Sequence, residues 1–366
     1  MSLRICWPVI SMTSKPQFGG ERVKVSDVFD LQMGKTPSRK NLEYWNNGDH
    51  EWVSIKDLGS YSKYVGTTKE TISELGRKES GIKPVPKDTL IMSFKLSLGK
   101  TAITTKETYT NEAIMAFLDR GEYSLDLEYM WHQFRTKNWE MGTNIAVMGK
   151  TLNKKTLGAS TICVPSILQQ QKIAMRLNFV QNLIDKALGE VKLLENLVKS
   201  RFVEMFGDPT KNQKSWEFGT VESLSVNLDS RRVPITQADR VPGPYPYYGA
   251  SGVVDYVADF IFEEPLLLIS EDGANLLART LPIAFSICGK TWVNNHAHIL
   301  KCHNEAGRIY LETLINMLDI SSYVTGSAQP KLNQKQLNSI PIMLPPLELQ
   351  QEFADFVAQV DKSGFA

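Results

Sequence analysis

The sequence lacks the features that would place it in a membrane or in an oxidising compartment. It has no run of about 18 apolar residues, the least that a membrane-spanning helix needs. Its opening segment, residues 1–8, is too short and too interrupted to be a secretory signal. The four cysteines lie far apart without a Cys-x-x-Cys pair, at Cys6, Cys163, Cys288 and Cys302. Reduced thiols fit this pattern, so we expect a cytoplasmic protein.

The chain also lacks a strong net charge. Its 41 basic and 40 acidic side chains leave a formal charge of +1 over 366 residues. Nucleic-acid binding would therefore depend on local basic patches, because the global field is too weak to attract a polyanion. A hydrophobic content of 42% and a charged content of 22% are typical of a globular protein. The length leaves room for two domains of roughly 150 residues each.

Motifs that would indicate an enzyme are missing. There is no Asp/Asn-Pro-Pro-Tyr/Phe tetrapeptide for amino-group methylation, no Gly-rich methyl-donor loop, and no evident nucleophile with its base. Gly-Lys-Thr tripeptides begin at positions 34, 99, 149 and 289, but each lacks the earlier glycine of a phosphate-binding loop. Phe29, Phe94, Asn144 and Ala284 stand there instead. We interpret these tripeptides as polar turns, whose lysine and hydroxyl groups are common contacts to DNA phosphates.

A metal site is the other chemistry that the sequence raises. His296 and His298 lie two residues apart, which on a strand places them on one face, and Cys302 and His303 follow. The spacing fits no paired set of zinc ligands. Strand histidines that face a polar groove are the simpler interpretation. We therefore expect neither a metal site nor a catalytic residue.

What the sequence does contain is an internal repeat. Residues 151–174 return as residues 331–354, and the step is 180 residues both from Asn153 to Asn333 and from Pro165 to Pro345. Each copy runs from a polar loop, through a short apolar strand that ends at proline, into a Gln-rich helix start. Such a duplication predicts two similar domains, each followed by a helix.

Short β-type runs and helical patterns predict the same mixed composition for both copies. Apolar runs at 89–94 and 113–118 correspond to runs at 266–270 and 297–300, and helical patterns follow at 127–134 and 308–318. We expect an α+β fold with two pseudo-repeated domains joined by long coiled-coil helices. The expected boundaries are an N-terminal segment at 1–20, a first domain at 21–165, a spacer helix at 166–207, a second domain at 208–346, and the start of a second spacer helix at 347–366.

The spacer helix has the clearest periodicity in the chain. Its apolar residues step by four and three alternately, which predicts a coiled-coil seam at Ile173, Leu177, Val180, Ile184, Ala187, Val191, Leu194 and Val198. Phe353, Val357 and Val360 begin the same stepping, so we expect the second helix to cover this seam. That helix runs for about twenty residues against about forty, and the seam beyond Ala187 should then pair with a second copy of the chain or with another subunit. We favour self-association.

Two groups of loops combine cations, hydroxyls and amides with aromatic rings, as DNA-binding surfaces do. They span residues 33–57 in the first domain and 231–252 with 292–296 in the second. These groups can anchor phosphates and read base edges, although each is equally compatible with an ordinary turn over a packed aromatic ring. The candidate DNA-binding residues are Lys35, Thr36, Ser38, Arg39, Lys56, Lys95, Lys100, Asn144, Arg231, Arg232, Tyr248, Ser251, Asn295, His296, Ser327, Gln329 and Lys331.

At these residues the chain resembles the specificity subunit of type I restriction-modification enzymes. The resemblance rests on residues 34–38, 44–45 and 52–58 in the first domain, and on 247–252, 293–296 and 332–351 in the second. It implies two pseudo-repeated target-recognition domains joined by long antiparallel coiled-coil helices, and each domain would read one half of a split, asymmetric DNA sequence. It also implies partner methyltransferase subunits with S-adenosylmethionine and a restriction subunit with ATP and Mg²⁺, while this chain binds no cofactor and is not catalytic.

Two alternatives remain open at this point. The chain could be a truncated, silent or recombinable specificity allele that does not assemble, and sequence does not separate this from the leading hypothesis. A stand-alone DNA-modifying enzyme is the other alternative, against which the missing catalytic motifs argue.

Overall fold

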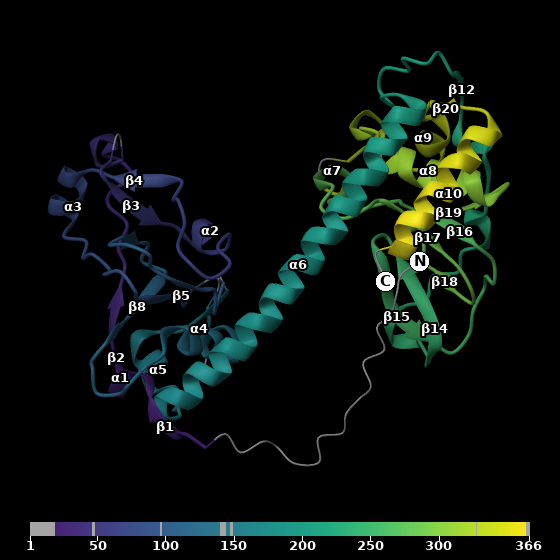
Figure 1. Ribbon diagram of the computed structural model, residues 1–366. Coiled ribbons are helices and arrows are strands. Elements are labelled where there is room, and N and C mark those ends of the chain that lie inside the picture. Colours follow the sequence, from purple (N-terminus) through teal and green to yellow (C-terminus); the bar gives the residue numbers. More distant parts are fainter. Residues whose placement is uncertain are drawn as a thin grey trace. The chain divides into compact units, whose positions relative to one another are not determined.

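The computed structural model describes residues 19–45, 48–95, 97–139, 144–146, 149–326 and 328–363. These residues form two compact units, which we call the first domain, up to Asp185, and the second domain, from Lys186. Each unit combines helices with antiparallel and mixed sheets (Figure 1). None of the described helices combines the length and the apolar character that crossing a membrane requires.

The described residues of the first domain contain two sheets with more than two strands. The larger has the order β2-β8-β5-β6 with antiparallel neighbours, and the smaller has the order β4-β3-β7, in which β3 and β7 are parallel. The strands of these sheets are β2 (Phe29–Met33), β3 (His50–Val53), β4 (Glu70–Ile72), β5 (Leu90–Ser93), β6 (Thr101–Ile103), β7 (Tyr109–Thr110) and β8 (Ile114–Asp119). The remaining elements are β1 (Glu21–Lys24), α1 (Val25–Val28), η1 (Leu42–Tyr44), α2 (Ile55–Leu58), α3 (Glu74–Ser80), α4 (Leu127–Thr136), β9 (Asn144–Ala146), β10 (Gly149–Thr151), α5 (Lys154–Ala159) and β11 (Thr161–Val164).

The second domain repeats this topology. Its larger sheet has the order β13-β19-β16-β17 and its smaller sheet the order β15-β14-β18, with β14 and β18 parallel. The strands are β13 (Ser225–Asn227), β14 (Pro242–Gly249), β15 (Gly252–Val257), β16 (Leu266–Ser270), β17 (Ala284–Ile287), β18 (Trp292–Val293) and β19 (Ala297–Cys302). The other elements are β12 (Glu217–Gly219), η2 (Val221–Ser223), η3 (Asp229–Arg231), η4 (Gln237–Asp239), α7 (Asn275–Ala278), α8 (Glu305–Met317), η5 (Ser321–Tyr323), α9 (Gln334–Ser339), β20 (Ile342–Leu344) and α10 (Leu347–Ser363). The duplication therefore includes the sheets as well as the repeated motif.

The repeated motif has the same structural role in both copies. Asn153 and Asn333 cap α5 and α9, and their side-chain oxygens accept from the backbone N–H groups of Thr156 at 2.8 Å and Gln336 at 3.0 Å. The side chains of Thr156 and Gln336 accept in return from the cap residues, which completes a capping box in each domain. The strand that follows pairs with the first strand of its own domain, β11 with β1 and β20 with β12. The equal spacing in the two copies thus produces the same helix cap and the same strand pairing in each domain.

A 40-residue helix, α6 (Ile167–Phe206), belongs to the first domain at its start and to the second at its end. Ala174 is buried in the apolar core of the first domain. Phe202 and Phe206 are buried in the core of the second domain, where both rings contact Phe353 of α10 with centroids 5.4 Å apart. Within the second domain α10 runs in the opposite direction to this end of α6 (Figure 1). The predicted antiparallel pairing therefore forms at the end of α6.

The seam of α6 is covered differently from our expectation. Side chains in its middle are between 42% and 53% exposed, namely Leu177, Val180, Ile184 and Val191. Ile173 packs on the core of the first domain, and Leu194 and Val198, which we expected to be uncovered, are half-buried. The reason is direction: in an antiparallel pair the start of α10 meets the end of α6. The apolar face of α10 is then occupied by the core of the second domain and does not reach the middle of the seam.

Candidate nucleic-acid interface

The Gly-Lys-Thr turn of the first domain is held tightly against its smaller sheet. A Cβ atom at Gly34 would lie 2.2 Å from the carbonyl oxygen of Thr110, so only glycine fits this approach. The backbone N–H of Lys35 donates to the same carbonyl at 2.8 Å, and the Trp52 indole donates to the Lys35 carbonyl at 3.0 Å. The Lys35 ammonium donates to the Ser80 carbonyl. This turn is therefore rigid, with its lysine at the surface.

The neighbouring polar residues have partners within the domain. Thr36 donates to Glu112, and the Arg39 guanidinium binds both carboxylate oxygens of Glu70. The same guanidinium lies 3.7 Å from the ring centroid of Trp45, a cation–π contact. The hydrogen bonds that Arg39 donates to Glu70 raise the pKa of the guanidinium. Arg39 would have to exchange Glu70 for a phosphate to contact DNA directly, whereas Ser38 and Lys56 are exposed.

A groove with three cations and one carboxylate, Asp185, lies beside residues 178–185 of α6. It encloses about 560 Å³ and is lined by residues that include Lys63, Lys100, Trp131, Arg135 and Asn178. Lys63 pairs with Glu128 at 3.0 Å. Over the described part of the chain, neither Lys100 nor Arg135 has a carboxylate within ion-pair distance, and the Arg135 guanidinium lies over the Trp131 ring at 5.0 Å. Two cations in this groove are thus available to an anion.

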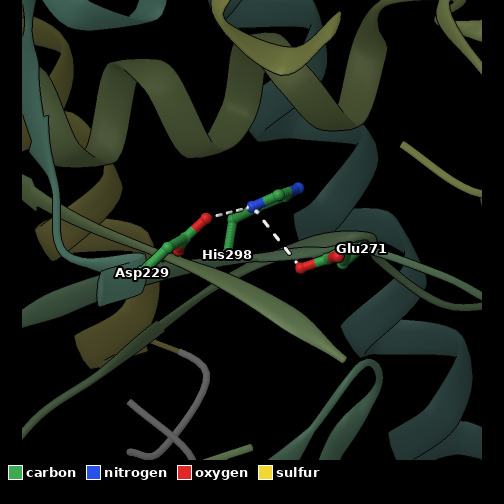
Figure 2. Close-up of side chains that lie close together, drawn as sticks. All are labelled: Asp229, Glu271 and His298. Atoms are coloured by element: carbon green, nitrogen blue, oxygen red, sulfur yellow. Dashed lines mark hydrogen bonds and ion pairs between the residues drawn. The ribbon is translucent and has the colours of Figure 1, made fainter. Parts of the chain in front are cut away.

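Asp229, Glu271 and His298 form a buried cluster in the second domain (Figure 2). Two of the candidates, Arg232 and Lys331, pair with this cluster. His298 Nδ1 lies 2.6 Å from Asp229 Oδ2 and 3.8 Å from Glu271 Oε2. Arg232 Nη1 lies 2.5 Å from the same Glu271 oxygen, and Lys331 Nζ lies 3.2 Å from the other oxygen. Among the described residues, Asp229, Glu271 and His298 form the one cluster whose atoms could hold a metal ion.

The two histidines that we placed on one strand face are separated in the structure. His298 lies on β19 and is buried, whereas His296 precedes the strand in an exposed turn and pairs with Asp272 at 2.7 Å. The turn begins before β19, so strand alternation does not apply to His296. His296, Cys302 and His303 are not brought together with His298 in the described residues.

The other candidates of the second domain are mostly at the surface. Arg231 pairs with Glu264 at 3.4 Å and lies over the Phe262 ring at 4.7 Å. Ser251, Asn295 and Gln329 are exposed, and Tyr248 is half-buried on β14. In the first domain, the Lys95 ammonium lies 5.1 Å from the centroid of the Phe94 ring. Asn144 lies on β9 with a side chain outside the described set, and Ser327 is outside the described residues altogether.

Sequence reasoning missed the residues that organise these candidates. Asp229, Glu271, Lys63 and Arg135 belong to the network or to the groove, and none was selected from the sequence. Only Asp229 gave a local signal, because it precedes Arg232 by three residues, a spacing at which opposite charges pair within one turn of helix. The others meet across the fold and leave no local pattern.

Comparisons with known proteins identify similar chains. Residues 19–193 and 213–365 both match the type I restriction modification DNA specificity domain. The MjaIX specificity subunit of Methanocaldococcus jannaschii is 26% identical over 374 residues, which cover 91% of this chain and 85% of that relative. The EcoprrI specificity subunit of Escherichia coli is 21% identical over 357 residues, which cover 93% and 87%.

One solved structure has the same fold. The crystal structure of a type I restriction-modification S subunit from M. genitalium has a TM-score of 0.58 and 14% identity, with 96% of this chain and 92% of that chain covered. At this identity the similarity concerns the fold alone.

Proposed function

The chain belongs to the family of type I restriction-modification DNA specificity domains, and we propose that it reads a two-part, asymmetric DNA target, one half with each domain. The observation that carries this proposal is the duplicated fold with different side chains on equivalent loops. Matching hydrogen bonds identify the equivalent positions: Asn111 N–H donates to Val53 O as Asn294 N–H donates to Tyr248 O. The next residue along is Glu112 in one domain and Asn295 in the other. Different groups at one position would read different bases.

The groove of the first domain supports a path for the DNA backbone. Phosphates bind lysine and arginine side chains, and each neutralised phosphate contributes to affinity through released counterions. Lys100 and Arg135 are exposed and free of carboxylate partners over the described residues, so they bind a phosphate without first breaking an ion pair. Lys35, at the rigid Gly-Lys-Thr turn, provides a further cation on the same domain.

In this proposal the chain recognises DNA and catalyses nothing. Methyltransferase subunits with S-adenosylmethionine, and a restriction subunit with ATP and Mg²⁺, would carry the chemistry in the cytoplasm. The exposed stripe of α6 at Leu177, Val180, Ile184 and Val191 is available to such a partner. In isolation the stripe would instead pair with a second copy of the chain, because an apolar seam is self-complementary in a two-fold arrangement.

Light scattering at micromolar concentration tests the self-association. We expect a dimer for the wild type and a monomer for Val180→Lys combined with Ile184→Lys, since two charges would enter the seam. Lys186→Ala, an exposed change on the same helix, is the matched control. A wild-type chain that stays monomeric would contradict self-association.

A domain exchange tests the recognition proposal. Residues 21–165 are replaced with the first domain of another family member, and the target is determined with the methyltransferase subunits added. Only the first half of the target should change, because each domain has its own loops. If both halves change together, the domains do not read DNA independently and the proposal fails.

A further inference from the structure

Three segments of the second domain meet at His298. The ring lies on β19, Asp229 opens η3, and Glu271 follows β16 (Figure 2). His298 Nδ1 is 2.6 Å from Asp229 Oδ2, and Nε2 is 2.8 Å from the carbonyl oxygen of Leu332. The His298 side chain is 1% exposed, so water does not compete for either nitrogen. Both ring nitrogens are therefore committed to protein oxygens.

These partners decide the protonation of the ring. A carbonyl oxygen can only accept, so Nε2 carries a proton and donates to Leu332. An ionised carboxylate also only accepts, so Nδ1 must carry a second proton if Asp229 is charged. Burial would raise the pKa of Asp229, but hydrogen bonds from His298 and the Ile299 N–H, with the charge of Arg232, hold it below its usual range. Asp229 Oδ1 accepts from the Ile299 N–H at 2.8 Å, so both carboxylate oxygens act as acceptors and both ring nitrogens of His298 donate.

A bound metal ion is the competing explanation of this cluster. A metal on Nδ1 would take Asp229 Oδ2 and Glu271 Oε2 as further ligands, and the Nε2–H bond to a carbonyl would suit a ligating histidine. Arg232, however, already occupies both of these oxygens, with Nη1 2.5 Å from Glu271 and Nη2 3.5 Å from Asp229. Its Nη1 also donates to the Ala297 carbonyl at 2.9 Å. The guanidinium thus already supplies the positive charge that these two carboxylates would otherwise take from a metal ion.

We infer that His298 is a buried imidazolium that positions two DNA-facing loops of the second domain, an inference that rests on the proposed function. Through Asp229 it holds η3, which carries Arg231 and leads into Arg232. Through the Leu332 carbonyl it holds the segment 329–332, which carries the exposed Gln329 and Lys331. His298 is a positioning residue, because it acts through these loops without facing the solvent itself.

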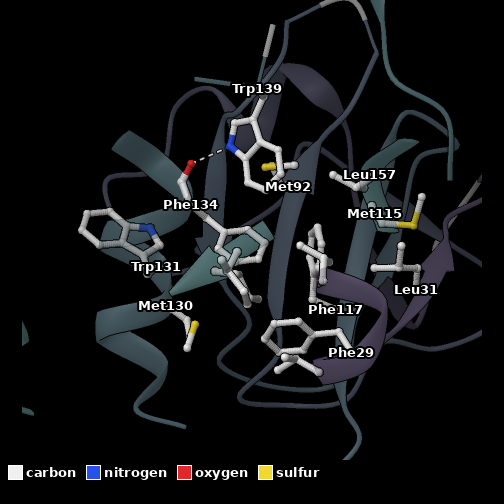
Figure 3. Close-up of a cluster of buried hydrophobic side chains, with 14 of the residues drawn as sticks. Phe29, Leu31, Met92, Met115, Phe117, Met130, Trp131, Phe134, Trp139 and Leu157 are labelled. Atoms are coloured by element: carbon white, nitrogen blue, oxygen red, sulfur yellow. Dashed lines mark hydrogen bonds between the residues drawn. The ribbon is translucent and has the colours of Figure 1, made fainter. Parts of the chain in front are cut away.

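Among the described residues, the equivalent place in the first domain is apolar. Leu152 N–H donates to the Phe94 carbonyl at 3.0 Å, as Leu332 N–H donates to the Glu271 carbonyl at 2.8 Å, so Phe94 and Glu271 are equivalent. By strand register Met115, beside Met92, is equivalent to His298, beside Ile269. Met115 lies in a core of methionines and aromatic rings (Figure 3). The imidazolium is therefore particular to the second domain and is no requirement of the fold.

Ring protonation can be measured directly in the full chain. With only five histidines, ¹⁵N-histidine labelling gives few NMR signals, and His298→Met identifies the one from His298. At neutral pH both of its ring nitrogens should be protonated, and Asp229→Asn should leave only one proton on the ring. A ring with a single proton in the wild type would overturn the inference. So would one equivalent of Zn²⁺ that binds the wild type but not His298→Met.

DNA binding tests the positioning role. His298→Met introduces the side chain of the equivalent position in the first domain, and His303→Met, at an exposed site, is the matched control. Discrimination at the second half-site should fall roughly tenfold, the scale of one lost base contact, while the first half-site is read as before. If His298→Met unfolds the second domain, Asp229→Asn, with its similar shape, replaces it in the same comparison.

Each result separates the inference from the function beneath it. Unchanged discrimination at the second half-site by a folded variant would refute the positioning role and leave DNA recognition intact. A wild-type chain that discriminates at neither half-site would refute the proposed function. The NMR measurement would still decide separately whether the His298 ring carries two protons. Hydrogen exchange that rises in both 229–232 and 329–332 of His298→Met would support the joint anchoring of the two loops.

Discussion

Met115 in the first domain and His298 in the second occupy equivalent places on equivalent strands, yet their surroundings are opposite in kind. Met115 lies among Phe117, Met92 and other apolar side chains, whereas His298 contacts a carboxylate and a carbonyl. The backbone hydrogen bonds between the strands are the same in both domains. The comparison teaches that strand pairing maintains the fold in both domains. The side chains that hold the loops in place can be apolar in one domain and charged in the other.

The exposed arginines of the two domains differ much less. Arg39 lies between Glu70 and the Trp45 ring, and Arg231 lies between Glu264 and the Phe262 ring. In both cases a carboxylate and an aromatic face hold the guanidinium in place at the surface. A preordered arginine loses less side-chain entropy when it binds a phosphate. The domains therefore hold their surface arginines in the same way and differ in the buried side chains that hold their loops.

The largest expected effect comes from removing one partner of the buried network. Arg232→Met leaves Glu271 and Asp229 without their guanidinium, which should lower the free energy of unfolding of the second domain by about 3 kcal/mol. Arg39→Met breaks an exposed pair and should cost about 1 kcal/mol or less. Urea unfolding of both variants measures the difference. Equal losses would mean that the network is not buried as described.

A reciprocal exchange sharpens the comparison. Met115→His places a ring in an apolar core that offers it no hydrogen-bond partner, which should cost about 2 kcal/mol in the first domain. Thermal unfolding is the measurement, and Met115→Leu, which keeps the core apolar, is the control. If Met115→His were as stable as the control, a buried histidine at this place would not need the carboxylate and carbonyl partners that His298 has.

Acid should weaken the buried cluster of the second domain. The pKa of Asp229 is lowered in the folded state, so its contribution is fully present above the unfolded value of about 3.9. That contribution is lost as the pH falls further, through the folded pKa. In Asp229→Asn we expect the stability of the second domain to depend less steeply on pH in the acid range. Circular dichroism, or hydrogen exchange in residues 225–302, measures this dependence. An unchanged dependence of stability on pH would show that the Asp229 carboxylate does not stabilise the second domain.

The smallest expected effect concerns the groove of the first domain. Lys100→Ala and Arg135→Ala should each reduce the slope of DNA affinity against salt by about one, the loss of one phosphate contact. Lys83→Ala, an exposed change outside the groove, is the control and should have no such effect. Fluorescence anisotropy over a salt series gives the slopes. Equal slopes for all three variants would place the DNA backbone elsewhere.

Much of the fold could be predicted because it depends on neighbours along the chain. Asn153 and Asn333 cap their helices with the residue three positions later, and the seam of α6 repeats every seven residues. The candidate site was less predictable. Lys35 and Arg231 could be selected for their charge, but their partners Ser80 and Glu264 lie far away in the sequence.

By itself the sequence determined the duplication, the capping boxes, the long α6 helix and the family, since each is written in local spacing or in a repeat. Only the tertiary structure decided that α10 covers the end of α6, and that Asp229, Glu271 and His298 form one cluster. Asp229 and His298 are 69 residues apart in the chain. Strand order brings such residues together, and no periodicity encodes strand order, because the pairing of distant strands depends on the energy of the whole core.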